Sequence, residues 1–246
     1  MAPYPISVVA LSFLAAIGMP AVGSAQSSPA REAAEVAVIR CYAQLPATLR
    51  SAAPDRAQRN RIRISGDMRR RWQVCAALER DRDDLIAIER LTADLVALVQ
   101  GGQAGSQPPG VADEAEKIAA ALIRTTRRES ASYKMVGSPI FNNILIEWGA
   151  KERGYCYHWT EALLKALPSD PFVHFERHWG GANIGRATEN NAVIVTARGV
   201  PVTSGIVYDA WRGAGHPWWR AVRDDHYRWG ERYDEAAIRG GLLAGE

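Results

Sequence analysis

The chain has 246 residues, a hydrophobic fraction of 47% and a formal net charge of +3 at pH 7. This composition is that of a globular protein with room for one mid-sized domain or two small ones. The small net charge does not indicate a nucleic-acid partner, because nucleic-acid-binding proteins usually carry a strong basic excess.

The start of the chain is apolar and carries no charged side chain before Arg31. The apolar stretch at 6–21 is short for a membrane span, and it leads into small residues at 23–25 that suit a signal peptidase. We therefore expect residues 1–25 to be a secretory signal peptide. The protein would then be exported to the periplasm or the extracellular space, with no stable membrane span after processing. An uncleaved anchor or a buried helix is the alternative.

Three cysteines, Cys41, Cys75 and Cys156, give an odd count for an oxidising compartment. Cys41 and Cys75 each lie in a segment with helical apolar periodicity, so we expect both at one helix interface. There they form either a disulfide or a pair of buried, reduced thiols. In both cases Cys156 is the thiol left over.

The first half of the mature chain predicts helices. Residues 31–45 form the first, and an apolar stripe at 85–98 marks another. Nine arginines between 56 and 82 predict a solvated helix face, with a patch for an anionic ligand as the alternative. We expect residues 26–100 to be a helical region, followed by a Gly- and Pro-containing linker at 101–112.

Residues 113–246 are expected to form an α+β domain. One helix begins at Asp113, whose side chain can cap it, and another opens with Ser138-Pro139. Segments 172–179, 192–197 and 203–211 then predict the strands of a small antiparallel sheet, and the last two form a hairpin.

Cys156 is predicted to lie at the start of a helix. Gly154 permits a sharp turn just before it, and residues 160–167 form an amphipathic helical run. The positive end of a helix stabilises a thiolate, so we expect the pKa of Cys156 to be lowered toward neutrality. The free N–H groups there could also hold an oxyanion. The alternative is a small buried residue that happens to begin a helix.

The order of a helix-start cysteine, a strand, and a hairpin ending in Asp209 resembles the core of papain-like cysteine enzymes, and the transglutaminase-like branch in particular. In that family a histidine opens the second strand and an aspartate closes the third. The resemblance spans about residues 139–212. Since neighbouring antiparallel strands place the start of one beside the end of the next, it implies that residues 189–191 lie next to Asp209 and over Cys156.

The family's histidine position reads Asn190 in this chain. An asparagine amide cannot take up a proton at neutral pH, so it cannot serve as a general base. Three explanations follow: another histidine serves, the domain is inactive and only binds, or the strand register is different.

The five histidines are His158, His174, His178, His216 and His226. His178 is the candidate base, because it lies near the predicted end of the first strand. His174 is four residues earlier, about 13 Å along a strand, which is too far to help. His158 is expected to point elsewhere, and a structural role remains the alternative for each.

We therefore expect an exported, thiol-dependent peptide or amide hydrolase or acyltransferase, in which Cys156 attacks a carbonyl carbon and forms a thioester. Asp209 would orient the base, or it is a turn residue that closes a strand. The aromatic segment 211–233 would cover the sheet or line a groove. The partner would be a peptide, a protein or a cell-wall substrate, and no cofactor or metal is expected. The alternatives are a catalytically inactive peptide- or glycan-binding envelope module and a structural envelope protein.

Overall fold

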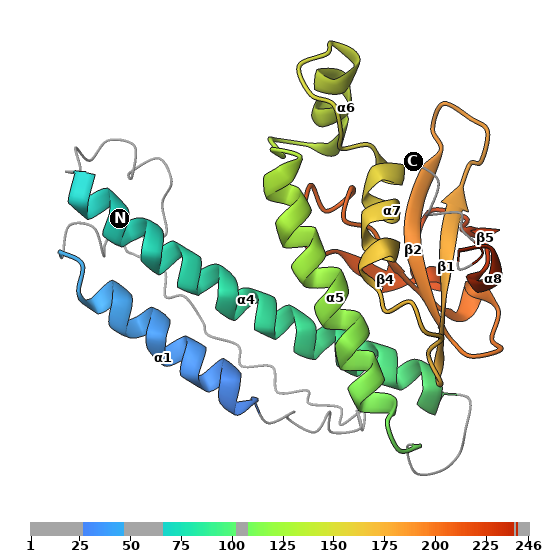
Figure 1. Ribbon diagram of the computed structural model, residues 1–246, viewed down its shortest axis with the longest axis horizontal. Coiled ribbons are helices and arrows are strands. Elements are labelled where there is room, and N and C mark those ends of the chain that lie inside the picture. Colours follow the sequence, from blue (N-terminus) through green and yellow to red (C-terminus); the bar gives the residue numbers. More distant parts are fainter. Residues whose placement is uncertain (1–26, 47–65, 102–107, 239, 241–246) are drawn as a thin grey trace, which may run out of the picture.

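The computed structural model describes residues 27–46, 66–101, 108–238 and 240, so the predicted signal peptide lies outside the described residues. Helices come first in the chain and a sheet follows, which confirms the α+β class (Figure 1). The helices are α1 (Pro29–Ala43), α4 (Gly66–Gln100), α5 (Val111–Ser132), α6 (Pro139–Glu147), α7 (Cys156–Ala166) and α8 (Glu235–Ala237). The strands are β1 (Phe175–Ala182), β2 (Asn190–Ala197), β3 (Ile206–Tyr208), β4 (Trp219–Ala221) and β5 (Gly230–Tyr233).

The five strands form one antiparallel sheet in the order β4-β3-β2-β1-β5. The predicted hairpin of the second and third strands is confirmed, with Val193 opposite Tyr208. The first strand begins three residues later than predicted, at Phe175. The reason is that backbone groups of residues 172–174 bind side chains instead. Glu114 accepts from two of their N–H groups, and Arg198 donates to the carbonyls of Phe172 and Val173.

The two faces of the sheet pack against different partners, because successive strand residues point to opposite sides. Val193 and Val195 of β2 share a core with residues of α4, α5 and α7. Ile194 lies in a separate cluster with Val207 and Trp229. The face that α7 covers is called the helix face below, and the other the open face.

The caps of the helices were only partly predictable. Ser138 caps α6 as expected, accepting from the Phe141 N–H at 3.2 Å. The predicted cap at Asp113 is wrong, because α5 begins earlier, after Gly110 at a φ of 86°. Only a residue tolerant of left-handed backbone fits that position easily.

A disulfide joins α1 to α4. Cys41 and Cys75 are bonded with their Cα atoms 5.5 Å apart, which decides between the two states left open by the sequence. Around the bond lies a small apolar cluster that includes Leu45 and Trp72. Farther along α4, Leu91 and Leu95 belong to the main core, together with residues of α5, α7 and the sheet. The elements on the two sides of the predicted linker therefore share one core. Among the described helices, none is long and apolar enough to cross a membrane.

Candidate active site

Cys156 is the first residue of α7, as the sequence predicts. Gly154 has a φ of 135° and turns the chain into the helix, a conformation that suits glycine. The ring of His158 fixes this turn, since its Nδ1 atom accepts from the N–H groups of Gly154 at 3.1 Å and Tyr155 at 3.3 Å. The His158 side chain therefore serves the helix start.

The thiol of Cys156 lies under the start of β2. Its Sγ atom is 3.8 Å from the carbonyl oxygen of Glu189, to which the S–H donates. The Nδ2 group of Asn191 donates to Sγ at 3.7 Å. Residues 189–191 therefore lie over Cys156, as the antiparallel geometry predicts.

Asn190 contacts Asp209 instead of the sulfur. Its Nδ2 group donates to Oδ2 of Asp209 at 2.8 Å, and both residues are buried. The expected juxtaposition of position 190 with the end of β3 is thus present. Strand alternation explains the division: Asn191 shares the helix face with Val193, and Asn190 shares the open face with Ala192.

Arg212 holds Asp209 in place. Asp209 accepts from the Arg212 N–H at 2.9 Å, and the guanidinium Nε lies 3.2 Å from its carboxylate. The same guanidinium donates two hydrogen bonds to Asp225, at 2.9 and 2.6 Å, and its carbon is 3.6 Å from the centre of the Trp218 ring. Trp229 donates to Asp225 from the other side at 2.9 Å. Asp209 is therefore part of a rigid network on the open face.

Burial controls the charge state of both site groups. It raises the pKa of the Cys156 thiol, and the hydrogen bonds from Asn191 and from the Tyr157 N–H offset this effect only in part. The sequence-based expectation of a lowered pKa is therefore wrong, because the thiol is more buried than a helix-start position implies. Burial also raises the pKa of Asp209, despite the opposing bonds from Arg212 and Asn190.

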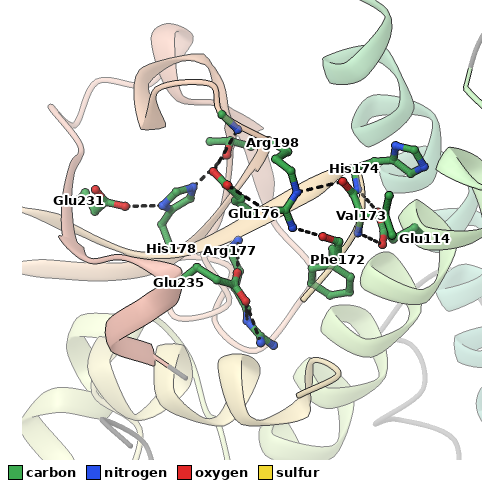
Figure 2. A network of polar contacts seen from close by, with 12 residues as sticks. Glu114, Phe172, Val173, His174, Glu176, Arg177, His178, Arg198, Glu231 and Glu235 are labelled. Atoms are coloured by element: carbon green, nitrogen blue, oxygen red, sulfur yellow. Dashed lines mark hydrogen bonds and ion pairs between the residues drawn. The ribbon is translucent and has the colours of Figure 1, made fainter. Parts of the chain in front are cut away.

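His178 is not brought to the thiol. It pairs with Ile194 in the middle of β1, because the strand continues to Ala182, and its side chain lies on the open face. Its Nδ1 atom is 2.5 Å from a carboxylate oxygen of Glu231, and its Nε2 atom is 2.9 Å from the Thr196 hydroxyl (Figure 2). The candidate base of the sequence analysis thus ties β1 to β5.

The neighbouring Arg177 makes a parallel connection. Its guanidinium and its backbone N–H both donate to Glu235 at 3.0 Å (Figure 2). His174 lies at the far end of this region, with Nε2 3.1 Å from the Pro109 carbonyl oxygen. His226 pairs with Asp225 at 3.1 Å on the outside of the Arg212 network.

Sequence reasoning placed Glu189 and Asn191 over the sulfur but missed the residues that hold these two in position. Asn191 accepts from Trp179 Nε1 at 2.7 Å, and its amide also donates to Glu189 at 3.1 Å. Arg232 of β5 pairs with the Glu189 carboxylate. Glu189 and Asn191 were included in the segment 189–191, but only strand parity identifies Asn191 as the one that faces α7. Arg232 and Trp179 gave no local signal, because they reach the site from other strands.

Within the part of the chain that the structure describes, no group of three or more His, Cys, Asp or Glu residues is placed to hold a metal ion. No protein-family model matches this chain, and no curated protein or solved structure is significantly similar to it.

Proposed function

We propose that this chain is an exported, non-catalytic binding module, with a site that resembles that of papain- and transglutaminase-like cysteine enzymes but lacks their base. One observation carries the proposal: besides the N–H of Tyr157, the groups that contact Cys156 Sγ among the described residues are the Asn191 amide and the Glu189 carbonyl. Neither takes up a proton at neutral pH. A partly buried thiol with a raised pKa stays protonated under those conditions and is a poor nucleophile.

The site offers hydrogen-bond donors to a ligand. The Asn191 amide donates to Sγ at 3.7 Å, and the N–H of Tyr157 in the first turn of α7 also donates to the thiol. Such donors suit the carbonyl or carboxylate oxygens of a peptide or a glycan. The ligand class of the proposal is therefore a peptide or glycan segment bound across the start of α7.

A thiol-dependent hydrolase or acyltransferase is the second candidate. The helix-start position of Cys156 and the Asn190–Asp209 pair beside it favour this function. In the reaction Sγ would attack the carbonyl carbon, the amine would leave with a proton, and water or an amine would release the acyl group from the thioester. Such a reaction needs an acceptor for the thiol proton, and neither the Asn191 amide nor the Glu189 carbonyl supplies one.

The pH dependence of Cys156 alkylation separates these functions, measured without reductant so that the Cys41–Cys75 bond stays intact. We expect the thiol to titrate above the value of about 8.5 for a free cysteine. His178→Ala should leave the titration unchanged, because that ring contacts Glu231 and Thr196 and not the thiol. A thiol that titrates well below the free value would instead support the enzyme.

Asn190→His tests whether the site has the enzyme-like arrangement. An imidazole at this position would take over the bond to Asp209, and a nearby imidazolium lowers the pKa of a thiol. We expect faster alkylation of Cys156 at neutral pH in this variant, and no such gain in the matched variant Asn190→Gln. A gain in neither variant would contradict the resemblance on which the proposal rests.

A further inference from the structure

The short helix α6 buries a polar side chain and exposes large apolar side chains, the opposite of the usual arrangement. Asn142 is its only fully buried side chain. The Asn142 amide donates to the Val136 and Ser138 carbonyls at 2.7 and 2.8 Å, and its Oδ1 atom accepts from Lys151 at 2.5 Å. A polar side chain therefore anchors this helix to the chain. The large apolar side chains that α6 and the residues next to it expose are Val136, Ile140, Phe141, Ile144 and Trp148.

The exposed apolar side chains point away from the rest of the molecule. Ile140, Ile144 and Trp148 are spaced four residues apart and share one side of the helix. The opposite side faces the body, where Ile146 lies near Gly154. Trp148 is 76% exposed and Ile140 is 67% exposed. Figure 1 shows α6 standing apart at one end of the molecule, above α5 and α7. This outward apolar side is called the α6 face below.

Basic residues gather beside the α6 face. A hollow of about 300 Å³, formed by the segments that precede and follow α6, is lined by Lys134, Lys151 and Arg153, with Glu152 as its acidic member. It adjoins a hollow of about 670 Å³ between α5 and α7, with which it shares Tyr133 and Arg153. The two hollows together have six cationic and three acidic side chains. The cationic ones are Arg124, Arg128, Lys134, Lys151, Arg153 and Lys165.

We propose that the α6 face docks on an anionic lipid surface, with its apolar side chains in the interfacial layer and the adjacent basic residues attracted to the headgroups. Helices that lie in the membrane interface combine an apolar side, aromatic residues and neighbouring cations. Tryptophan is favoured at this depth, because one edge of its ring is apolar and the other carries a hydrogen-bond donor. An uncharged apolar partner explains the apolar face but not the net excess of three cationic side chains in the adjoining hollows.

Vesicle co-sedimentation tests this docking, and the result does not depend on the state of Cys156. The protein should bind vesicles of phosphatidylcholine mixed with phosphatidylglycerol, and bind vesicles of phosphatidylcholine alone more weakly. Ile140→Asp should lower the partition coefficient by about tenfold or more, because a carboxylate is strongly disfavoured among acyl chains. Lys134→Gln should lower it by about fivefold, since each cation near an anionic surface adds about 1 kcal/mol.

Ile39→Asp is the matched control. Ile39 is 68% exposed on α1, nearly the same as Ile140, but it lies far from the α6 face along the chain. This variant should bind vesicles like the wild type, and thermal melting should show that both variants fold. Equal loss in the two variants would overturn the proposal. So would a wild type that ignores anionic vesicles and self-associates in solution, with Ile140→Asp restoring a monomer, because the α6 face would then bind a second copy of the chain.

Discussion

The arm, formed by α1 and the first two thirds of α4, and the body, formed by the rest of α4, α5, α7 and the sheet, are stabilised by different means. The buried apolar residues of the arm are few, with Val38, Leu45 and Cys75 among them. Its helices are joined by a disulfide and by polar contacts such as that of Tyr42 with Glu79 at 2.9 Å. The body has one large core shared by its helices and the helix face of the sheet.

The difference shows where each region can tolerate change. Burial of apolar area stabilises the body. Truncation of a single core side chain therefore leaves a cavity that weakens the packing of all the elements around it. The arm has little area to bury, and it depends on a covalent link and on individual polar contacts. The body can therefore hold buried polar groups, such as Asp209 at the end of β3, without losing its structure.

The largest expected effect is in the body. Phe175 is fully buried in the main core, so Phe175→Ala should lower the free energy of unfolding by about 3–5 kcal/mol. The control is Phe141→Ala on the α6 face, where the side chain is 45% exposed. The free energy of unfolding of this variant should change by no more than about 0.5 kcal/mol. Denaturant titration followed by circular dichroism gives both values. Similar losses in the two variants would show that the core is not where the stability of the body lies.

The disulfide tests the arm. Cys41→Ala should cost about 2–4 kcal/mol, because the bond restricts the unfolded chain. Hydrogen exchange should increase in α1 and in the first turns of α4, while protection in the sheet stays high. Cys156→Ser should change the stability little, since that thiol is only half-buried and makes weak contacts. Loss of protection in the sheet of the Cys41 variant would contradict the independence of the two regions.

The stability of the body in acid is expected to depend on Asp225, on the open face of the sheet. Burial alone would raise its pKa, but hydrogen bonds from Arg212 and Trp229 outweigh burial and lower the pKa below its ordinary value. A carboxylate with a lowered folded pKa adds stability that is present above the unfolded value of about 3.9 and is lost as the pH falls below it. Asp225→Asn should therefore cost about 1.5–3 kcal/mol at pH 7, and its stability should depend less on pH below about 4. Parallel acid profiles of the two proteins would contradict this assignment.

The smallest effect is expected from Tyr133, between α5 and α7. Burial raises its pKa to about 12, from 10.0. The unfolded chain then loses this proton at a lower pH than the folded protein, so stability falls as the pH rises from about 10 to about 12. Tyr133→Phe should flatten the alkaline profile at a cost of about 1 kcal/mol or less at pH 7. An unchanged alkaline slope would show that other groups control it.

Local patterns predicted much of the fold. The helix start at Cys156, the cap at Ser138 and the hairpin of β2 and β3 follow from nearby residues, and the family resemblance implied the position of residues 189–191 over the thiol. The details of the site depended on longer-range contacts. Glu114 and Arg198 shift the start of β1, and the continuation of that strand leaves His178 in mid-sheet.

Two properties of the site were not available to sequence reasoning. Which of two adjacent asparagines faces the sulfur depends on strand parity, because a shift of one residue exchanges the faces. The pKa of Cys156 depends on how deeply β2 and its neighbours cover the thiol, and helix-start position alone does not give this depth. The contact of Arg232 with Glu189 likewise joins residues that are 43 positions apart.

The continuity of α4 gives the molecule a fixed length. The helix has 35 residues, and at 1.5 Å per residue it is about 52 Å long. The disulfide end at Cys75 is about 24 Å along the axis from Leu91 in the main core. The arm is thus a spacer that sets the separation of the disulfide from the main core. In solution the same spacer should give a larger radius of gyration than a compact protein of equal mass, which small-angle X-ray scattering measures directly.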